Sequence, residues 1–207
     1  GYEVSQQTGQ PSLDQVIQCY QDDKLAAYLE TVFRNDESVK AAIERIAAEA
    51  IEAVKDGKTL LVLDDAISHQ ENALWLDPHL VVSAIDQALV KEGLRRDCSL
   101  LLRSASLRSL HDIIVALGLG ADAVSPYYMF MTVLDESVKP LVNLYSALTK
   151  GLEKVISTIG IHELRAYGRL FSSIGLNDEV ADYLVIVNFF GSNELDYNFE
   201  AMKEDAK

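Results

Sequence analysis

The sequence predicts an α/β fold in which a small, mostly parallel sheet resembles an incomplete β/α barrel and a helical C-terminal region follows. Short apolar runs alternate with helical patterns of about a dozen residues, which is typical of parallel strands joined by crossover helices and buried on both faces. The runs occupy residues 60–63, 98–102 and 121–124. Since crossovers between parallel strands are almost always right-handed, few topologies fit this order.

Composition divides the chain into four regions. Residues 1–12 are polar and contain Gly and Pro, so we expect a linker or tail. We expect an α/β core over 13–135, a helical extension over 136–187 and an acidic C-terminal tail over 188–207. The chain begins with Gly1 and not with Met, as expected of an excised piece of a longer protein or of a cleaved tag.

Three helices are expected before the first strand. Ser12 followed by Gln15 predicts a capping box that starts a short helix, and a second helix is expected over residues 23–33. The clearest helical pattern covers residues 39–54, where apolar residues recur on one face and charged residues occupy the other. Gly57 follows it, at the position where a left-handed residue ends a helix.

The helices after the first strand carry equally local signals. Asp77 and Pro78 provide a capping carboxylate and a proline at the first helical position, and Gly160 closes a long amphipathic pattern. Residues 66–77 are expected to form a loop. The expected helices are 78–92, 107–117, 141–159, 162–174 and 178–185.

Composition also excludes several classes of function. With 207 residues and 49% hydrophobic content, the chain can bury a sizeable core. Its net charge of −14 and pI of about 4.6 argue against nucleic acid, whose phosphates need clustered Lys and Arg. The apolar runs are too short to span a membrane and no signal peptide is evident, so we expect a cytoplasmic protein that binds neither nucleic acid nor membrane.

Four uncharged positions have expected structural roles. Cys19 and Cys98 lack metal-ligand spacing, and an iron–sulfur cluster normally needs more thiolates. Cys98 begins an apolar run, so an inert buried thiol is expected. We expect His111 to face the core, and Ala123 to lie in a buried strand where an Arg would be unpaired and strongly destabilising.

Carboxylates at the end of the first strand are the main candidates for chemistry. Asp64 and Asp65 follow that run, and parallel α/β sheets place active groups at the carboxyl ends of their strands. One hypothesis is a magnesium site or acid/base pair, with Asp122 as a third carboxylate; the other, which we favour, is a loop cap or solvated pair. Gly118 and Gly120 precede a strand instead of opening a helix, so they do not match a dinucleotide loop.

Arginines cluster around the second run. Such a cluster either binds a small anion or offsets nearby carboxylates. No Gly-x-Ser-x-Gly elbow accompanies the serines of residues 104–109, so no activated hydroxyl is identified. The cluster consists of Arg95, Arg96, Arg103 and Arg108.

Three blocks of the chain resemble successive parts of one known domain. They read AIERIAAEAIEAVKDGKTLLVLDD, VVSAIDQALVKEGLRRDCSLLLRSASLRSLHDIIVALGLGADAVSPY and LTKGLEKVISTIGIHELRAYGRLFSSIGLNDEV, and cover most of residues 39–180. They are similar to the central domain of the glutamate synthase large subunit. The residues that fit its motifs, and for which we expect structural roles, include Gly93, Arg95, Gly118, Gly120, Asp122, Pro126, Gly151 and Gly160.

The chain also departs from the family pattern, which identifies it as a divergent member or a paralogue. Residues 64–66 read Asp-Asp-Ala where the family has Ser-Asp-Arg. Arg103 stands where the family has Glu near the end of the second strand, and the stretch from Tyr167 to Phe171 is shorter than usual.

The resemblance implies a connecting role without chemistry of its own. Glutamate synthases release the glutamine nitrogen at an N-terminal cysteine and reduce the 2-iminoglutarate adduct on FMN, which an iron–sulfur cluster supplies with electrons. These groups lie outside the matched region, so we expect no catalytic, cofactor or metal site in this chain and no activity from it alone. The expected partners are the amidotransferase and FMN-binding domains, which would cover Tyr128, Phe130, Met131, Phe189 and Phe190.

Two hypotheses of another class stay open. One is a small stand-alone α/β enzyme that uses Asp64 and Asp65, and the other is an anion-binding module that uses Arg95 or Arg103. The parent gene on either side of the chain would separate both from a connecting domain. The sequence leaves open the electron donor, the oligomeric state and the residues that line any ammonia channel.

Overall fold

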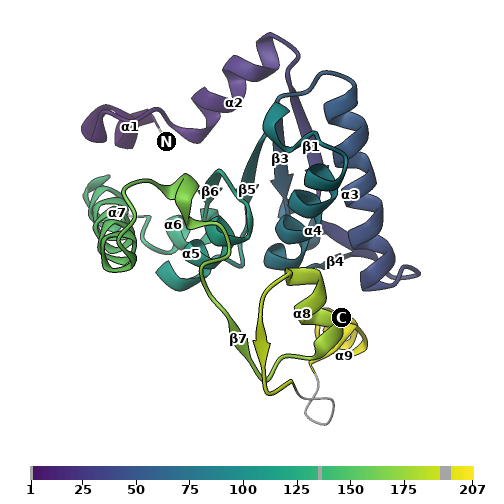
Figure 1. Ribbon diagram of the computed structural model, residues 1–207. Coiled ribbons are helices and arrows are strands. Elements are labelled where there is room, and N and C mark those ends of the chain that lie inside the picture. Colours follow the sequence, from purple (N-terminus) through teal and green to yellow (C-terminus); the bar gives the residue numbers. More distant parts are fainter. Residues whose placement is uncertain (1, 135–136, 192–196) are drawn as a thin grey trace.

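The computed structural model describes residues 2–134, 137–191 and 197–207 (Figure 1). Its centre is a four-stranded sheet in the order β1-β3-β5-β6, with every neighbouring pair parallel. The strands follow each other in the sheet as they do in the chain, as in a β/α barrel and unlike a doubly wound sheet. The predicted incomplete β/α barrel is confirmed. The strands are β1 (Ala26–Glu30), β3 (Leu60–Asp64), β5 (Ser99–Arg103) and β6 (Ala123–Ser125).

The other elements surround this sheet. The crossover helices are α3 (Val39–Lys55), α4 (Pro78–Lys91) and α5 (Leu110–Leu119). The remaining α-helices are α1 (Tyr2–Thr8), α2 (Leu13–Asp22), α6 (Tyr127–Thr132), α7 (Lys139–Ile159), α8 (Asp178–Leu184) and α9 (Phe199–Asp205). Short strands and single turns complete the fold: β2 (Val32–Arg34), β4 (Ala73–Trp75), β7 (Ser173–Ile174), β8 (Asn188–Phe189), η1 (Ala66–His69), η2 (Arg95–Asp97) and η3 (Leu164–Tyr167).

The two faces of the sheet are covered differently. Alternate residues of a strand point to opposite faces. On one face, Leu63 and Leu102 are buried in the main core with α3 and α4, which lie together along β1 and β3 in Figure 1. On the other face, Val62 and Leu101 pack against Ile17 of α2. The helix α2 therefore covers part of this second face. The helix α7 contacts α1 and α5, on the side of the molecule away from α3.

Local sequence signals set the ends of several helices as predicted. Ser12 and Gln15 form the predicted capping box of α2. The apolar pattern of residues 39–54 forms α3, and the structure adds that Ser38 is its N-cap. Asp77 accepts hydrogen bonds from the first backbone N–H groups of α4. Gly57, at φ +86°, follows α3 in the conformation expected of it.

The helix predicted over residues 23–33 is wrong, since this segment forms β1 and β2. Lys24 has a φ of +58°, which ends α2 and prevents a second helix from continuing it. β1 then pairs in parallel with β3 over its whole length, and β2 pairs antiparallel with β4. Strand pairing with residues distant in the sequence therefore determines the structure of residues 23–33. The strand β4 also interrupts the loop that was expected over residues 66–77.

The helix predicted over residues 162–174 is also wrong. Only η3 and the short strand β7 form there. Arg169, at φ +49°, breaks the helical course, and its N–H donates to the carbonyl of Gly118 at 2.7 Å. A hydrogen bond to a distant element replaces the local helical bond.

Both ends of the chain contain more structure than expected. The polar segment 1–12 contains α1, which contacts α7. The acidic segment 188–207 contains β8 and α9, and α9 buries Phe199 and Met202 against the core that includes α3. Residue 1, residues 192–196 and the expected boundary between 135 and 136 lie outside the described residues.

Two burial predictions are wrong. Ala123 is exposed in β6, so an Arg there would reach solvent. His111 is exposed in the first turn of α5, where Ile113 and Ile114 occupy the buried face instead. Cys98 is buried as predicted, with only 8% of its surface exposed.

Candidate functional site

A pair of oppositely charged residues lies at the carboxyl ends of two neighbouring strands. Asp64 of β3 and Arg103 of β5 are register partners. Arg103 Nη1 lies 2.9 Å from Oδ1 and 2.6 Å from Oδ2 of Asp64, and both side chains are partly buried. Asp64 Oδ1 also accepts the N–H of Ala66 at 2.9 Å. The Arg that departs from the family pattern therefore neutralises a carboxylate that departs from it too.

The next residue, Asp65, organises the loops at this edge. Its side chain is buried, with 1% of the residue exposed. It accepts hydrogen bonds from Ser104 Oγ at 2.5 Å, from Tyr127 Oη at 2.9 Å and from the N–H of Ala105 at 3.0 Å. Because three donors from the segments after β5 and β6 converge on it, Asp65 holds these loops together.

Tyr127 contacts both Asp65 and Arg103 at this edge of the sheet. The guanidinium carbon of Arg103 lies 4.6 Å from the centre of its ring, which is cation–π geometry. His69 Nε2 lies 3.3 Å from Tyr127 Oη. Burial, and then the negative charge of Asp65, raise the pKa of Tyr127 well above its usual value. The phenol therefore stays protonated and serves as a hydrogen-bond donor to Asp65.

The structure does not bring Asp122 to these carboxylates. Asp122 directly precedes β6, at the amino edge of the sheet, whereas Asp64 and Asp65 lie at the carboxyl edge. Among residues 2–134, 137–191 and 197–207, no three His, Cys, Asp or Glu side chains form a group that could hold a metal ion. The hypothesis of three carboxylates around one magnesium ion is wrong for this geometry.

A second ionic network lies at the amino edge of the four-stranded sheet, where the strands begin. Arg95 Nε lies 2.7 Å from Asp86 Oδ1, and Arg95 Nη2 lies 2.9 Å from Asp122 Oδ2. The other Asp86 oxygen pairs with Arg169 Nη1 at 2.9 Å. Asp122 also accepts the N–H of Leu100 at 2.8 Å. The network ties α4, β5, the start of β6 and the segment after η3 to one another.

The arginines that the sequence groups together are thus separated in space. Arg95 belongs to the amino edge and Arg103 to the carboxyl edge, and each is paired with carboxylates. Arg96 and Arg108 are exposed. Of the two alternatives for this cluster, the ion pairs of Arg95 and Arg103 agree with arginines that offset nearby carboxylates and not with one anion-binding site.

The glycines of the family motifs lie either where two segments of the chain pack closely or where a helix ends. Gly93 and Gly160 follow α4 and α7 with φ of +74° and +83°. A Cβ on Gly151 would lie 2.5 Å from Leu110, and one on Gly118 would overlap the rings of Phe171 and Tyr167. Pro126 is buried directly before α6.

Sequence reasoning missed Asp86, Arg169 and the pair of Asp77 with His79. Asp86 is 7% exposed within the buried face of α4; a lone carboxylate in an otherwise apolar helical stripe is a signal that the sequence did contain. His79 Nδ1 lies 3.2 Å from Asp77 Oδ1, and its Nε2 lies 3.0 Å from the carbonyl of Asp112. This histidine joins the starts of α4 and α5.

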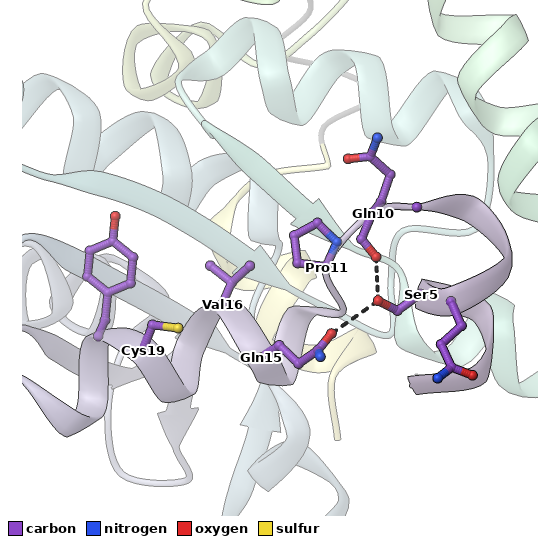
Figure 2. A pocket seen from close by; sticks show the side chains of 9 residues that line it. Ser5, Gln10, Pro11, Gln15, Val16 and Cys19 are labelled. Carbon is purple, nitrogen blue, oxygen red and sulfur yellow. Dashed lines mark hydrogen bonds between the residues drawn. The ribbon is translucent and has the colours of Figure 1, made fainter.

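An open groove separates α1 from α2 (Figure 2). Ser5 Oγ lies 2.5 Å from the carbonyl of Gln10 and 3.1 Å from Oε1 of Gln15. Val16 and Cys19 contribute apolar and thiol surface from α2. The described residues that line the groove are all uncharged, so the groove offers no charge that would hold an ionic ligand.

Comparison with solved structures supports the class of fold. A mutant of flavocytochrome b2 superimposes with a TM-score of 0.56 at 16% sequence identity, covering 76% of this chain and 38% of that one. A second mutant, with benzoylformate, gives the same TM-score and identity. At this identity the likeness concerns the fold alone, and it agrees with an incomplete β/α barrel.

Comparison with sequences defines the family. The model of the glutamate synthase central domain matches residues 8–177, and the chain belongs to this family. It is 31% identical to the glutamate synthase [NADPH] large chain of Bacillus subtilis over 70% of this chain and 10% of that protein. It is 32% identical to the glutamate synthase [NADH] of Schizosaccharomyces pombe over 82% of this chain and 9% of that protein. The chain thus spans about a tenth of the length of these relatives. Within the described part of the chain, no helix is long and apolar enough to cross a membrane.

Proposed function

We propose that this chain is a non-catalytic connecting domain of a glutamate-synthase-like enzyme. It would pack between a glutamine amidotransferase domain and an FMN-binding synthase domain, which together make glutamate from glutamine and 2-oxoglutarate, and the proposal includes a cytoplasmic location. The observation that carries it is the family match over residues 8–177, in a chain that spans about a tenth of its relatives.

The chemistry of the carboxyl edge supports a structural role. A general base needs an available lone pair near a reactive proton, and a nucleophile needs a base within reach. Asp64 is neutralised by Arg103, and Asp65 is engaged by three donors. Ser104 already donates its hydroxyl proton to Asp65, and its oxygen accepts the N–H of Ser106 at 3.1 Å. These groups hold loops in place instead of facing a substrate.

Several backbone N–H groups at the same edge are already used within the chain and are not free for a flavin phosphate. Phosphate sites use free backbone N–H groups at a helix N-terminus or a glycine-rich loop. After β5, the N–H groups of Ala105, Ser106 and Arg108 already donate to Asp65, Ser104 Oγ and Asp112. Ser109 caps α5 by accepting the N–H of Asp112. In this proposal the FMN and the iron–sulfur cluster would be held by other domains of the enzyme, and the exposed Cys19 and the buried Cys98 would ligate neither.

Apolar side chains on the surface support packing against other domains. Tyr128 and Met131 of α6 and Leu134 just after it are 52%, 61% and 67% exposed. Phe189 and Phe190 are 50% and 86% exposed. Contiguous exposed apolar surface commonly marks an interface. Neither the stand-alone enzyme nor the anion-binding module accounts for it.

The test is the sequence of the parent gene on either side of the chain. An amidotransferase domain with an N-terminal cysteine before residue 1, and an FMN-binding domain with cluster cysteines after residue 207, are expected. A gene that encodes only these 207 residues would contradict the proposal.

A further inference from the structure

The two short strands β7 and β8 form a ribbon on the surface of the molecule. Ser173 pairs with Asn188 and Ile174 pairs with Phe189, in parallel. We define the β7–β8 ribbon as residues 173–174 and 187–190. In Figure 1 it lies at the lower edge of the view, beside α8 and away from the four-stranded sheet.

The ribbon has its polar side inward and its apolar side outward. Ser173 Oγ lies 2.8 Å from Asn188 Oδ1, and Asn188 Nδ2 donates to the carbonyl of Leu176 at 3.0 Å. The register partners Ile174 and Phe189 are 74% and 50% exposed. A strand at a surface normally presents polar residues to water and apolar residues to the core. The inverted pattern indicates that another surface covers the outward side.

More apolar side chains extend this outward surface. Val187 directly precedes β8 and is 61% exposed. Phe190 is 86% exposed. Solvated aromatic and aliphatic side chains at this density are unusual on a free surface.

α8, which lies between the two strands of the ribbon in the sequence, is attached to the rest of the fold. α8 buries Val180 and Ala181 in contact with α4. Ser83 Oγ of α4 donates to the carbonyl of Tyr183 at 2.9 Å, and Arg169 Nε donates to that of Leu184 at 3.3 Å. The ribbon is therefore presented in a defined geometry, which lowers the entropic cost of binding a partner.

We infer that the β7–β8 ribbon is a docking surface for another domain of the same long polypeptide. The expected partner surface is an apolar depression, which receives Phe189 and Phe190, with Lys or Arg at its rim. The length of the relatives, about tenfold that of this chain, provides such a domain, and to this extent the inference rests on the proposed function.

Charge favours this occupant over a second copy of the chain. Asp178 and Asp182 of α8 are exposed, and Asp178 Oδ1 lies 3.3 Å from Asn188 Nδ2 of the ribbon. The net charge of the chain is −14. Two identical ribbons would bring acidic rims together, which opposes association, whereas a basic rim would complement them.

Oxidative footprinting of the wild-type proteins tests the inference. Hydroxyl radicals would be applied to the 207-residue chain and to the full-length polypeptide, and oxidation would be measured for each peptide by mass spectrometry. Phe189 and Phe190 should be oxidised severalfold less in the long polypeptide. Tyr28, which is 49% exposed on β1 and so matches Phe189 at 50%, serves as the internal reference.

A variant adds a thermodynamic readout. Phe190→Ser should leave the melting temperature of the 207-residue chain unchanged, because the side chain is 86% exposed there, and should lower that of the long polypeptide. Equal oxidation of the phenylalanines in both proteins would overturn the inference. Protection that rises with the concentration of the 207-residue chain would overturn it in favour of a second copy. The proposed function fails separately, if the parent gene encodes no further domain.

Discussion

Gly120 and Asp86 are packed so closely that a Cβ on Gly120 would lie 2.6 Å from Cγ of Asp86. The carboxylate is held from both sides, by Arg95 at 2.7 Å and by Arg169 at 2.9 Å. Arg95 Nη2 also donates to the carbonyl of Gly120 at 2.8 Å. The turn between α5 and β6 can therefore approach α4 only because Gly120 has no side chain.

Gly120→Ala should be strongly destabilising for two reasons. The residue has a φ of +127°, and the added methyl would displace a buried, doubly paired carboxylate. We expect a loss of roughly 3 kcal/mol or more in the free energy of unfolding. Gly57→Ala is the matched control, since Gly57 has a φ of +86° but nothing within 4 Å of its Cβ position; it should lose about 1 to 2 kcal/mol. Equal losses in urea denaturation would show that the contact with Asp86 does not matter.

Asp65→Asn should cost more stability than Asp64→Asn. An amide at residue 65 would present an NH₂ group to donors that now converge on a carboxylate, which should cost about 3 kcal/mol. Among the charged groups that the structure describes, Asp64 is a partner of Arg103 alone, and the two side chains are 20% and 32% exposed, so losing the charge at residue 64 should cost less, about 1 to 2 kcal/mol. Thermal and urea unfolding of both variants would check the order. A larger loss from Asp64→Asn would reject Asp65 as the organiser of the loops.

The pairing of Asp77 with His79 should make stability depend on pH. Burial alone lowers the pKa of His79, but the hydrogen bond and charge of Asp77 and the carbonyl of Asp112 outweigh it, so the pKa lies above the usual 6.5. The protonated form is therefore favoured in the folded state. Its stabilisation is fully present below the unfolded pKa and is lost as the pH rises through the folded pKa. The opposite partner, Asp77, has a lowered pKa and titrates below its usual 3.8, outside this window.

The measurement compares wild type with His79→Gln. The difference in their free energies of unfolding should be larger near about pH 5.5 than near about pH 8.5. A difference that stays constant over this range would mean that His79 does not titrate differently in the two states. His111→Gln is the matched control, because it makes the same substitution at an exposed position of α5.

Elements with local signals could be predicted, whereas those fixed by distant partners could not. Ser38 and Gly57 delimit α3, and Asp77 caps α4, because capping bonds are made within a few residues of the sequence. β1 was mistaken for a helix because its identity depends on pairing with β3. The segment around Arg169 was mistaken for the same reason, since its bonds go to Gly118 and Asp86.

The same distinction applies to the candidate site. Asp64 and Asp65 could be placed at the carboxyl end of a strand from the sequence alone. That Arg103 neutralises Asp64 follows from the register of β3 and β5, which the sequence did not specify. Asp122 does not act as the third carboxylate of that hypothesis, because its side chain accepts hydrogen bonds from Arg95 and from the N–H of Leu100 at the start of the sheet.

The last prediction is that the isolated chain binds no flavin and shows no glutaminase activity. A flavin phosphate would need free N–H groups after β5, but those of Ala105, Ser106 and Arg108 are bonded within the chain. Glutamine hydrolysis would need an activated nucleophile, and burial raises the pKa of the Cys98 thiol, which keeps it protonated and unreactive. The test is incubation with FMN, gel filtration and a visible spectrum, with ammonia release from glutamine measured in parallel against a buffer control. Stoichiometric retention of flavin, or turnover above that control, would contradict the connecting role, because either would require a binding or catalytic site in this chain.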